Sequence, residues 1–163
     1  MSRCRYREDM PTPRVSIDKQ TPAAYKALIA VSTEVAVAAE TAGLPRSVME
    51  LVNMHCSQIN GCAFCLSLHR EAAGAAGVTD QQLAVLPAWR DAPSLYTDEM
   101  RAALEIAEMV TRLPDHDTAD CAYERAADVL DADQISAVIW GATAINAFNR
   151  VSILSRYNVH PRP

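Results

Sequence analysis

The apolar positions of this chain recur every three to four residues, which is the spacing of helices that bury one face. Residues that start and stop helices separate the apolar segments. Pro22 after Thr21 suits a helix start, Gly43 suits the end of that helix, and Asn60-Gly61 suits the end of the next. The pattern therefore predicts successive helices over residues 21–42, 45–60 and 62–73. The apolar stripe expected on the first of them runs through Leu28, Val31, Val35 and Ala38.

Helical patterning continues through the second half of the chain. Thr79 and Thr97 are expected N-caps, and Asp131 with Gln134 makes a capping box for the last helix. That helix is apolar around much of its circumference, as is typical of a helix at the centre of a bundle or between subunits, so we expect an oligomer. The predicted elements are a short helix over 83–86, a loop over 89–93, a helix over 97–113 closed by Pro114, a polar connector at 115–118, a helix over 119–130 and a last helix to about Arg156.

Composition supports one helical fold class. Half of the 163 residues are apolar, alanine is frequent, and the runs of Val, Ile and Thr that favour strands are absent. The length suits a single domain with a core of its own. We predict an all-α, compact helical bundle over residues 20–163, preceded by an N-terminal arm over residues 1–19, which is charged and contains Pro11 and Pro13.

Charge and hydropathy argue against two kinds of partner. The formal net charge is −5 and no basic block is present, so we expect no nucleic-acid partner. No uninterrupted apolar run approaches the roughly 18 to 20 residues of a membrane span, and residues 1–14 lack the hydrophobic segment of a signal peptide. We therefore expect no membrane partner and a cytoplasmic location.

Three chemically reactive side chains share one predicted helix face. The five cysteines are unevenly spaced, which does not fit a secreted disulfide framework. At about 100° per residue, Cys62 and Cys65 lie about 60° apart on a helix, and His69 falls between them near the next turn. A histidine one turn from a thiol can deprotonate it, and a second thiol can condense with the oxidised first. The run therefore predicts dithiol redox chemistry.

A cysteine pair of this spacing has other interpretations besides dithiol redox chemistry. Zinc needs four ligands, and the run supplies three, with Cys56 or His55 as possible fourth ligands. Ordinary buried cysteines are the other interpretation. A thioredoxin-like site would need a βαβ context, which this helical sequence lacks. The attacking thiol stays open at this point, because Cys62 is nearer the helix N-terminus whereas Cys65 is one turn from His69.

Glu50 is a further candidate on the preceding helix. It lies twelve residues before Cys62, and the Asn60-Gly61 turn could fold its helix back against the helix of the cysteines. A carboxylate placed there could orient the imidazole of His69 and stabilise its charged form. The ordinary interpretation of a helical glutamate is a solvated surface residue.

Together, Glu50, Cys62, Cys65 and His69 form the pattern Glu-x11-Cys-x2-Cys-x3-His. This pattern resembles the core motif of AhpD-like alkylhydroperoxidases in the carboxymuconolactone decarboxylase superfamily, over about residues 45–77. The resemblance implies that Cys65 is the peroxidatic thiol, that Cys62 is the resolving thiol, and that His69 with Glu50 is a proton relay. Decarboxylase members act without the cysteine pair, so the pair favours the redox branch.

The resemblance also implies the partners of the reaction. The substrate would be hydrogen peroxide or a small organic hydroperoxide, reduced without a cofactor, metal or flavin. A dithiol or lipoyl-bearing protein would then reduce the resulting disulfide, and the protein would assemble as a trimer or hexamer. Some members carry a second histidine between the cysteines, where this chain has Phe64, which implies a simpler relay. The rival function is a non-catalytic stress-response protein that senses redox state or holds zinc.

The remaining candidate residues receive simpler interpretations. Cys56 is expected to be a small buried residue. His55 lies about 140° from Glu50 on a helical wheel, so it should face elsewhere. Cys4 and Cys121 have no partner in the sequence, His116 and His160 fall in a predicted loop or tail, and Trp140 and Phe148 are expected in the core or an interface.

Overall fold

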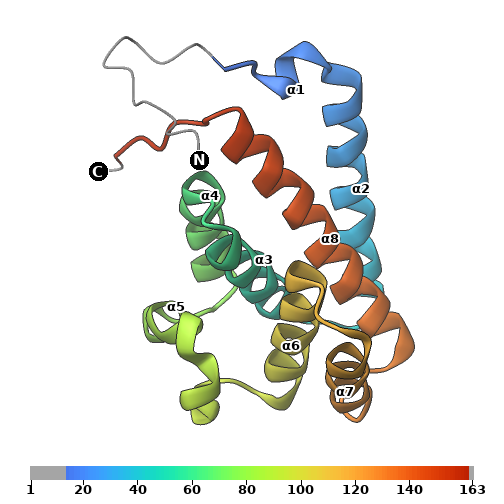
Figure 1. Ribbon diagram of the computed structural model, residues 1–163. Coiled ribbons are helices and arrows are strands. Elements are labelled where there is room, and N and C mark those ends of the chain that lie inside the picture. The colour runs from blue at the N-terminus through green and yellow to red at the C-terminus, as the bar shows by residue number, and fades with distance from the viewer. Residues whose placement is uncertain (1–13, 162–163) are drawn as a thin grey trace, which may run out of the picture.

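The computed structural model describes residues 14–161, which form helices and connecting turns without a strand (Figure 1). Two short 3-10 segments, η1 and η2, connect α5 to α6. The all-helical prediction is confirmed for these residues. The elements are α1 (Ile17–Gln20), α2 (Pro22–Thr41), α3 (Arg46–Asn60), α4 (Ala63–Ala75), α5 (Asp80–Val85), η1 (Leu86–Asp91), η2 (Pro93–Leu95), α6 (Asp98–Arg112), α7 (His116–Ala127) and α8 (Ala132–Leu154).

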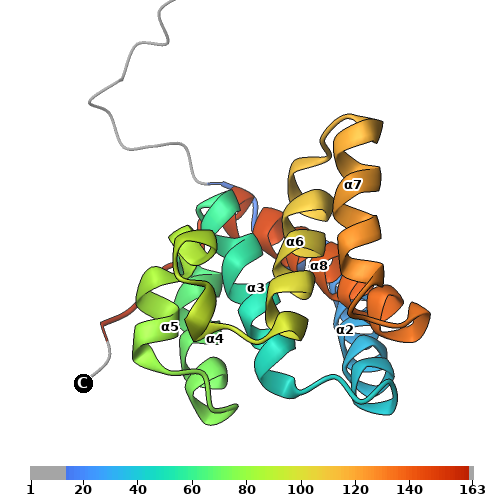
Figure 2. The same cartoon turned by 90° about the horizontal axis from the view of Figure 1, so that it is seen from below.

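Helices α3, α6 and α8 pack against one another and contain most of the core. Helix α2 packs along α8, α4 along α3, and α7 along α6, so that the three central helices each have an outer neighbour (Figure 2). Val52 of α3, Leu104 of α6 and Val138 of α8 are fully buried. The free energy gained by burying such side chains, about 1.5 to 3 kcal/mol each, holds the central helices together.

The helix starts and stops expected from the sequence are largely those observed. Thr79 forms a capping box with Gln82, as Asp131 does with Gln134, and Thr97 accepts a hydrogen bond from the Met100 amide. Pro22 begins α2, although the Thr21 side chain makes no capping hydrogen bond. Local capping therefore explains where these helices begin.

Several predicted boundaries are wrong. Residues 17–20 form the short helix α1 instead of belonging to an extended arm, and the loop predicted over 89–93 is mostly 3-10 helix. The connector predicted at 115–118 is the first turn of α7, because the Asp115 carboxylate caps the helix by accepting from the Thr118 amide. His116 is thus helical, and α8 ends at Leu154. Residues 1–13 of the predicted arm, with Cys4, lie outside the described residues.

Helix α2 is far more exposed than its predicted stripe implies. Val35 and Ala39 are its buried residues, whereas Val31 and Ala38 are exposed. By length and composition alone, Pro22–Thr41 could also cross a membrane. Lys26, Glu34 and Glu40 interrupt the apolar residues of α2, so the helix contains no unbroken apolar run of that length. Its exposed face adjoins Trp140, which is 55% exposed, across a groove of about 830 Å³ between α2 and α8.

Candidate functional site

A tight reversal between α3 and α4 builds the site. Gly61 ends α3 in the left-handed conformation (φ +69°), which glycine adopts at little cost. The Cys62 amide then donates to the Ser57 carbonyl at 2.9 Å and the Gly61 amide to the Gln58 carbonyl at 3.2 Å, the two bonds of a Schellman motif. The reversal lets α4 pack back along α3, as the sequence predicted.

The reversal brings Glu50 of α3 against His69 of α4. His69 Nδ1 lies 2.8 Å from Glu50 Oε2, and both side chains are mostly buried. The surface interpretation of Glu50 is therefore wrong. When Nδ1 carries the proton and donates it to the carboxylate, the imidazole Nε2 is left as a proton acceptor. The second carboxylate oxygen of Glu50 lies 3.8 Å from Arg46 Nε, at the solvent side of the pair.

The two thiols lie at the first turn of α4. Cys62 is the N-cap residue, and its Sγ accepts from the Cys65 amide at 3.4 Å. The two sulfur atoms are 2.6 Å apart, both cysteines are free, and both are buried. A disulfide bond is about 2.05 Å long, so oxidation of the two thiols to a disulfide would need only a small movement of the sulfur atoms. The sequence-based proximity of Cys62 and Cys65 is therefore observed.

The environments of the two thiols differ. Burial raises the pKa of Cys62, and the adjacent Cys65 side chain raises it further, while the Cys65 amide and the Ser152 hydroxyl partly oppose the rise. Cys65 lines a cleft of about 820 Å³ between α2, α3, α4 and α8, whereas Cys62 is not among the residues that line it. Glu50 and His69 line the same cleft. Three of the four predicted site residues, Glu50, Cys65 and His69, thus line one cavity, and Cys62 contacts Cys65.

The remaining cleft wall is mainly apolar. Phe64 lines it and packs edge-on against Tyr157, with ring centroids 5.0 Å apart. Gly141 of α8 lets the Met49 side chain fit close to the helix, because a Cβ at Gly141 would lie 2.5 Å from Met49 Cε. The cleft can hold an organic molecule beside Cys65. Apolar side chains along it include Val35, Leu44, Met49, Phe64, Leu68, Ile145 and Phe148.

Helix α8 contributes a polar stripe that the sequence analysis missed. Asn60 Nδ2 donates to Asn146 Oδ1 at 2.7 Å and to Asn149 Oδ1 at 2.8 Å, and Asn149 Nδ2 donates to Ser57 Oγ at 3.0 Å. These bonds fasten the turn before Cys62 to α8. Ser152, one turn further on, has its Oγ 3.7 Å from Cys65 Sγ. The available signal was the spacing of Asn146, Asn149 and Ser152 on one face of an otherwise apolar helix.

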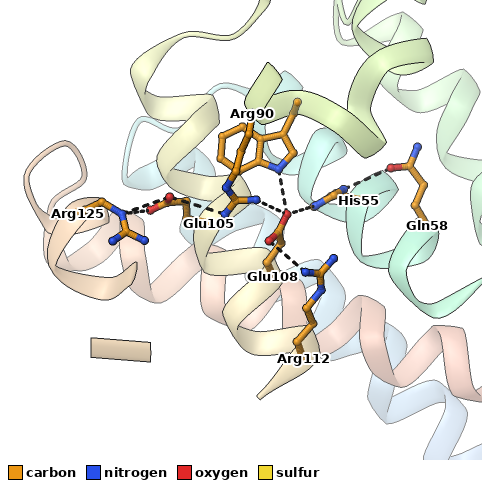
Figure 3. A network of polar contacts seen from close by, with 8 residues as sticks. His55, Gln58, Arg90, Glu105, Glu108, Arg112 and Arg125 are labelled. Carbon is orange, nitrogen blue, oxygen red and sulfur yellow. Dashed lines mark hydrogen bonds and ion pairs between the residues drawn. The ribbon is translucent and has the colours of Figure 1, made fainter. Parts of the chain in front are cut away.

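His55 belongs to a separate network (Figure 3). Its Nε2 lies 2.8 Å from Glu108 Oε1, which also accepts from Trp89 and Arg90. Burial would raise the pKa of Glu108, but the hydrogen bonds from His55, Arg90 and Trp89 outweigh it and lower that pKa to about 2. His55 therefore faces away from Glu50, as predicted, and is engaged outside the cysteine pair.

The other cysteines lie outside the cleft. Cys56 is buried, as expected, accepts a hydrogen bond from Thr111 Oγ1 at 3.2 Å, and has a pKa that burial raises to about 11. Cys121 is exposed on α7. Among the residues that the structure describes, no group of three or more His, Cys, Asp and Glu side chains is arranged to hold a metal ion.

Fold and site together define an all-helical protein with a dithiol pair next to a histidine–glutamate pair. The model of the carboxymuconolactone decarboxylase family matches residues 21–109, over half of the chain and all four motif residues. The chain therefore belongs to this family, and it is AhpD-like within it, as the motif predicted.

Two relatives illustrate the similarity. An uncharacterised Bacillus subtilis protein, YdfG, is 36% identical over 108 residues, which are 66% of this chain and 73% of YdfG. A crystal structure of an Agrobacterium tumefaciens protein of unknown function, described as a candidate antioxidant defence protein AhpD, shares the fold with a TM-score of 0.80 and 29% identity. That alignment covers 93% of this chain and all of the other.

Proposed function

We propose that this protein is a thiol-dependent peroxidase that reduces hydrogen peroxide or small organic hydroperoxides. One observation carries the proposal: a pair of free thiols 2.6 Å apart lies at a cleft that also holds a hydrogen-bonded histidine and glutamate. Family membership and the likeness to a candidate antioxidant defence protein support it.

Cys65 is the peroxidatic residue in this proposal and Cys62 the resolving residue. Cys65 lines the cleft and is the thiol that a peroxide can reach, while Cys62 is buried and does not line the cleft. The Cys65 thiolate attacks one peroxide oxygen, the O–O bond breaks, and a sulfenic acid and an alcohol or water result. The Cys62 thiol then displaces water from the sulfenic acid, which forms the disulfide.

His69 and Glu50 move the protons of this reaction. His69 Nε2 accepts the proton from Cys65 and returns it to the alkoxide or hydroxide that leaves. Glu50 accepts the Nδ1 hydrogen bond, which orients the ring and stabilises the imidazolium. Because Phe64 stands where some relatives carry a second histidine, the relay uses a single imidazole.

Reduction of the disulfide completes the cycle. A dithiol or lipoyl-bearing protein attacks the disulfide by thiol exchange and restores both thiols, and no metal or flavin takes part. We further propose a cytoplasmic homo-oligomer, a trimer or hexamer, whose interface includes the exposed apolar face of α2 and Trp140.

Peroxide consumption tests the proposal directly. With excess dihydrolipoamide as reductant, the wild-type protein should consume cumene hydroperoxide catalytically, and Cys65→Ser should not. Cys121→Ser, which removes an exposed thiol away from the cleft, is the control and should keep the wild-type rate. Full turnover by Cys65→Ser would refute the proposal, and stoichiometric zinc in the protein as purified would favour a zinc-holding function instead.

A further inference from the structure

Ser152 of α8 is the one hydroxyl in hydrogen-bonding distance of Cys65 among the contacts of the described residues. Its Oγ lies 3.7 Å from Cys65 Sγ, within the range of hydrogen bonds to sulfur, and the residue is 5% exposed. It lines the cleft together with Cys65 and His69.

We infer that the Ser152 hydroxyl donates a hydrogen bond to the Cys65 thiolate and is a further catalytic side chain of the site. This inference rests on the proposed peroxidase function, because it assigns Ser152 to the thiolate that attacks the peroxide. No additional reactant is needed.

The hydrogen bond reverses direction when the thiol ionises. In the resting protein, the Cys65 S–H donates to Ser152 Oγ. After the proton moves to His69 Nε2, rotation about the Cβ–Oγ bond lets the hydroxyl donate to the thiolate. Hydrogen bonds to charged acceptors are about twice as strong as neutral ones, so the reversed bond favours the thiolate. When sulfur bonds to the peroxide oxygen, its negative charge passes to the leaving oxygen, which takes the proton from His69.

The surrounding structure holds Ser152 in place. Asn149, one turn earlier on α8, is fully buried and tied to Asn60 and Ser57. The Ser152 carbonyl accepts from the Tyr157 amide at 3.0 Å, which fixes the end of α8. The hydroxyl also opposes the effect of burial on the pKa of Cys62 by hydrogen bonding. Preorganised donors of this kind need little rearrangement during reaction.

Other titratable groups also face the cleft, from three helices. A substitution at position 152 leaves all of them in the chain, so a test of Ser152 does not remove any of their charges. They are Tyr25 and Glu40 from α2, Arg46 and Glu50 from α3, and His69 from α4.

The test measures the ionisation of Cys65 without peroxide. In a Cys62→Ser background, the alkylation rate of the Cys65 peptide with iodoacetamide is followed by mass spectrometry between about pH 5 and pH 10. Ser152→Ala should move the half-maximal point of this profile upward by about one pH unit, which lowers the rate at neutral pH by about tenfold. Ser152→Thr, which keeps the hydroxyl, should restore most of the original profile.

Ser152→Val and Ser152→Thr form a matched pair, since the two side chains have the same shape and differ in a methyl and a hydroxyl. The comparison stays informative if Ser152→Ala folds poorly, and circular dichroism confirms folding of each variant. Thr143→Val removes an exposed hydroxyl from the same helix and should leave the profile unchanged. Identical profiles for the Val and Thr variants would overturn the inference. Because no peroxide is used, absent peroxidase turnover would be a separate result that contradicts the proposed function alone.

Discussion

His69 Nδ1 lies 2.8 Å from Glu50 Oε2, across the interface between two helices joined by a glycine turn. This contact fixes the imidazole tautomer that leaves Nε2 free to accept a proton. It also gives the mostly buried Glu50 carboxylate a hydrogen-bond partner.

Replacing Glu50 by glutamine should slow oxidation of Cys65. Glutamine can still accept the Nδ1 hydrogen bond, but it cannot stabilise the imidazolium by charge. We expect the second-order rate constant for the first oxidation step to fall by about tenfold to hundredfold, measured by stopped flow with cumene hydroperoxide. Glu124→Gln on the exposed side of α7 is the control. An unchanged rate constant in the folded Glu50→Gln variant would show that Glu50 is not part of the proton relay.

Gly141 should control which peroxides fit the cleft. In Gly141→Ala the new Cβ displaces the flexible end of Met49 toward the cavity, since the two carbons would otherwise be 2.5 Å apart. We expect KM for cumene hydroperoxide to rise severalfold while kcat/KM for hydrogen peroxide changes little. Shortening the obstructing side chain in Gly141→Ala/Met49→Ala should reverse the effect. Equal relative changes of the kinetic constants for the two peroxides would contradict the role of Gly141 in peroxide selection.

Glu108 should make stability sensitive to acid. Its pKa in the folded protein is about 2, below the ordinary value of 4.5, so the unfolded state binds more protons as the pH falls. The stabilisation is present above about pH 5 and is lost progressively toward pH 2, to an extent of about 3 kcal/mol. Urea unfolding at pH 7 and pH 3 measures it. Glu108→Gln should show a weaker loss between these two pH values, and a loss as large as that of wild type would exclude Glu108 as the cause.

Trp140 should contribute to subunit association. Ile29, Val37 and Trp140 are 46%, 54% and 55% exposed, although such side chains are usually covered. Trp140→Glu places a charge beside the groove between α2 and α8 and should shift the protein to a smaller species in light scattering after size-exclusion chromatography. Tyr123→Glu, an exposed aromatic position on α7, should leave the assembly intact. A wild-type monomer would contradict the proposed oligomer.

Local signals explain how much of this structure was predictable. Capping at Thr79, Thr97 and Asp131 depends on side chains within three residues, and the sequence pattern found each of them. The Asp115 cap has the same chemistry, but the run of polar residues around it is equally typical of a connector. Boundaries of this kind depend on which of several polar residues forms the cap.

The site was predictable only in part, because it combines local and distant residues. One predicted helix carries Cys62, Cys65 and His69, and the four-residue motif links Glu50 to them. Asn149 and Ser152 come from a helix about ninety residues away along the chain, as the spacing in their hydrogen bonds to Ser57 and Cys65 shows. Their spacing on one face of an apolar helix marks them as unusual, but the packing of α8 against α3 and α4 places them at the site. The exposure of α2 was hidden for a similar reason, since an apolar stripe does not specify what covers it.

Intact mass is the most direct measurement of the proposed chemistry. Reduced wild-type protein, Cys62→Ser and Cys65→Ser are each treated with one equivalent of cumene hydroperoxide, and the modified residue is located by peptide mapping. We expect wild type to lose two hydrogens through a disulfide between Cys62 and Cys65, Cys62→Ser to gain one oxygen at Cys65, and Cys65→Ser to stay unchanged. No mass change in wild type, or oxidation of Cys65→Ser as fast as wild type, would contradict a peroxidase based on this thiol pair.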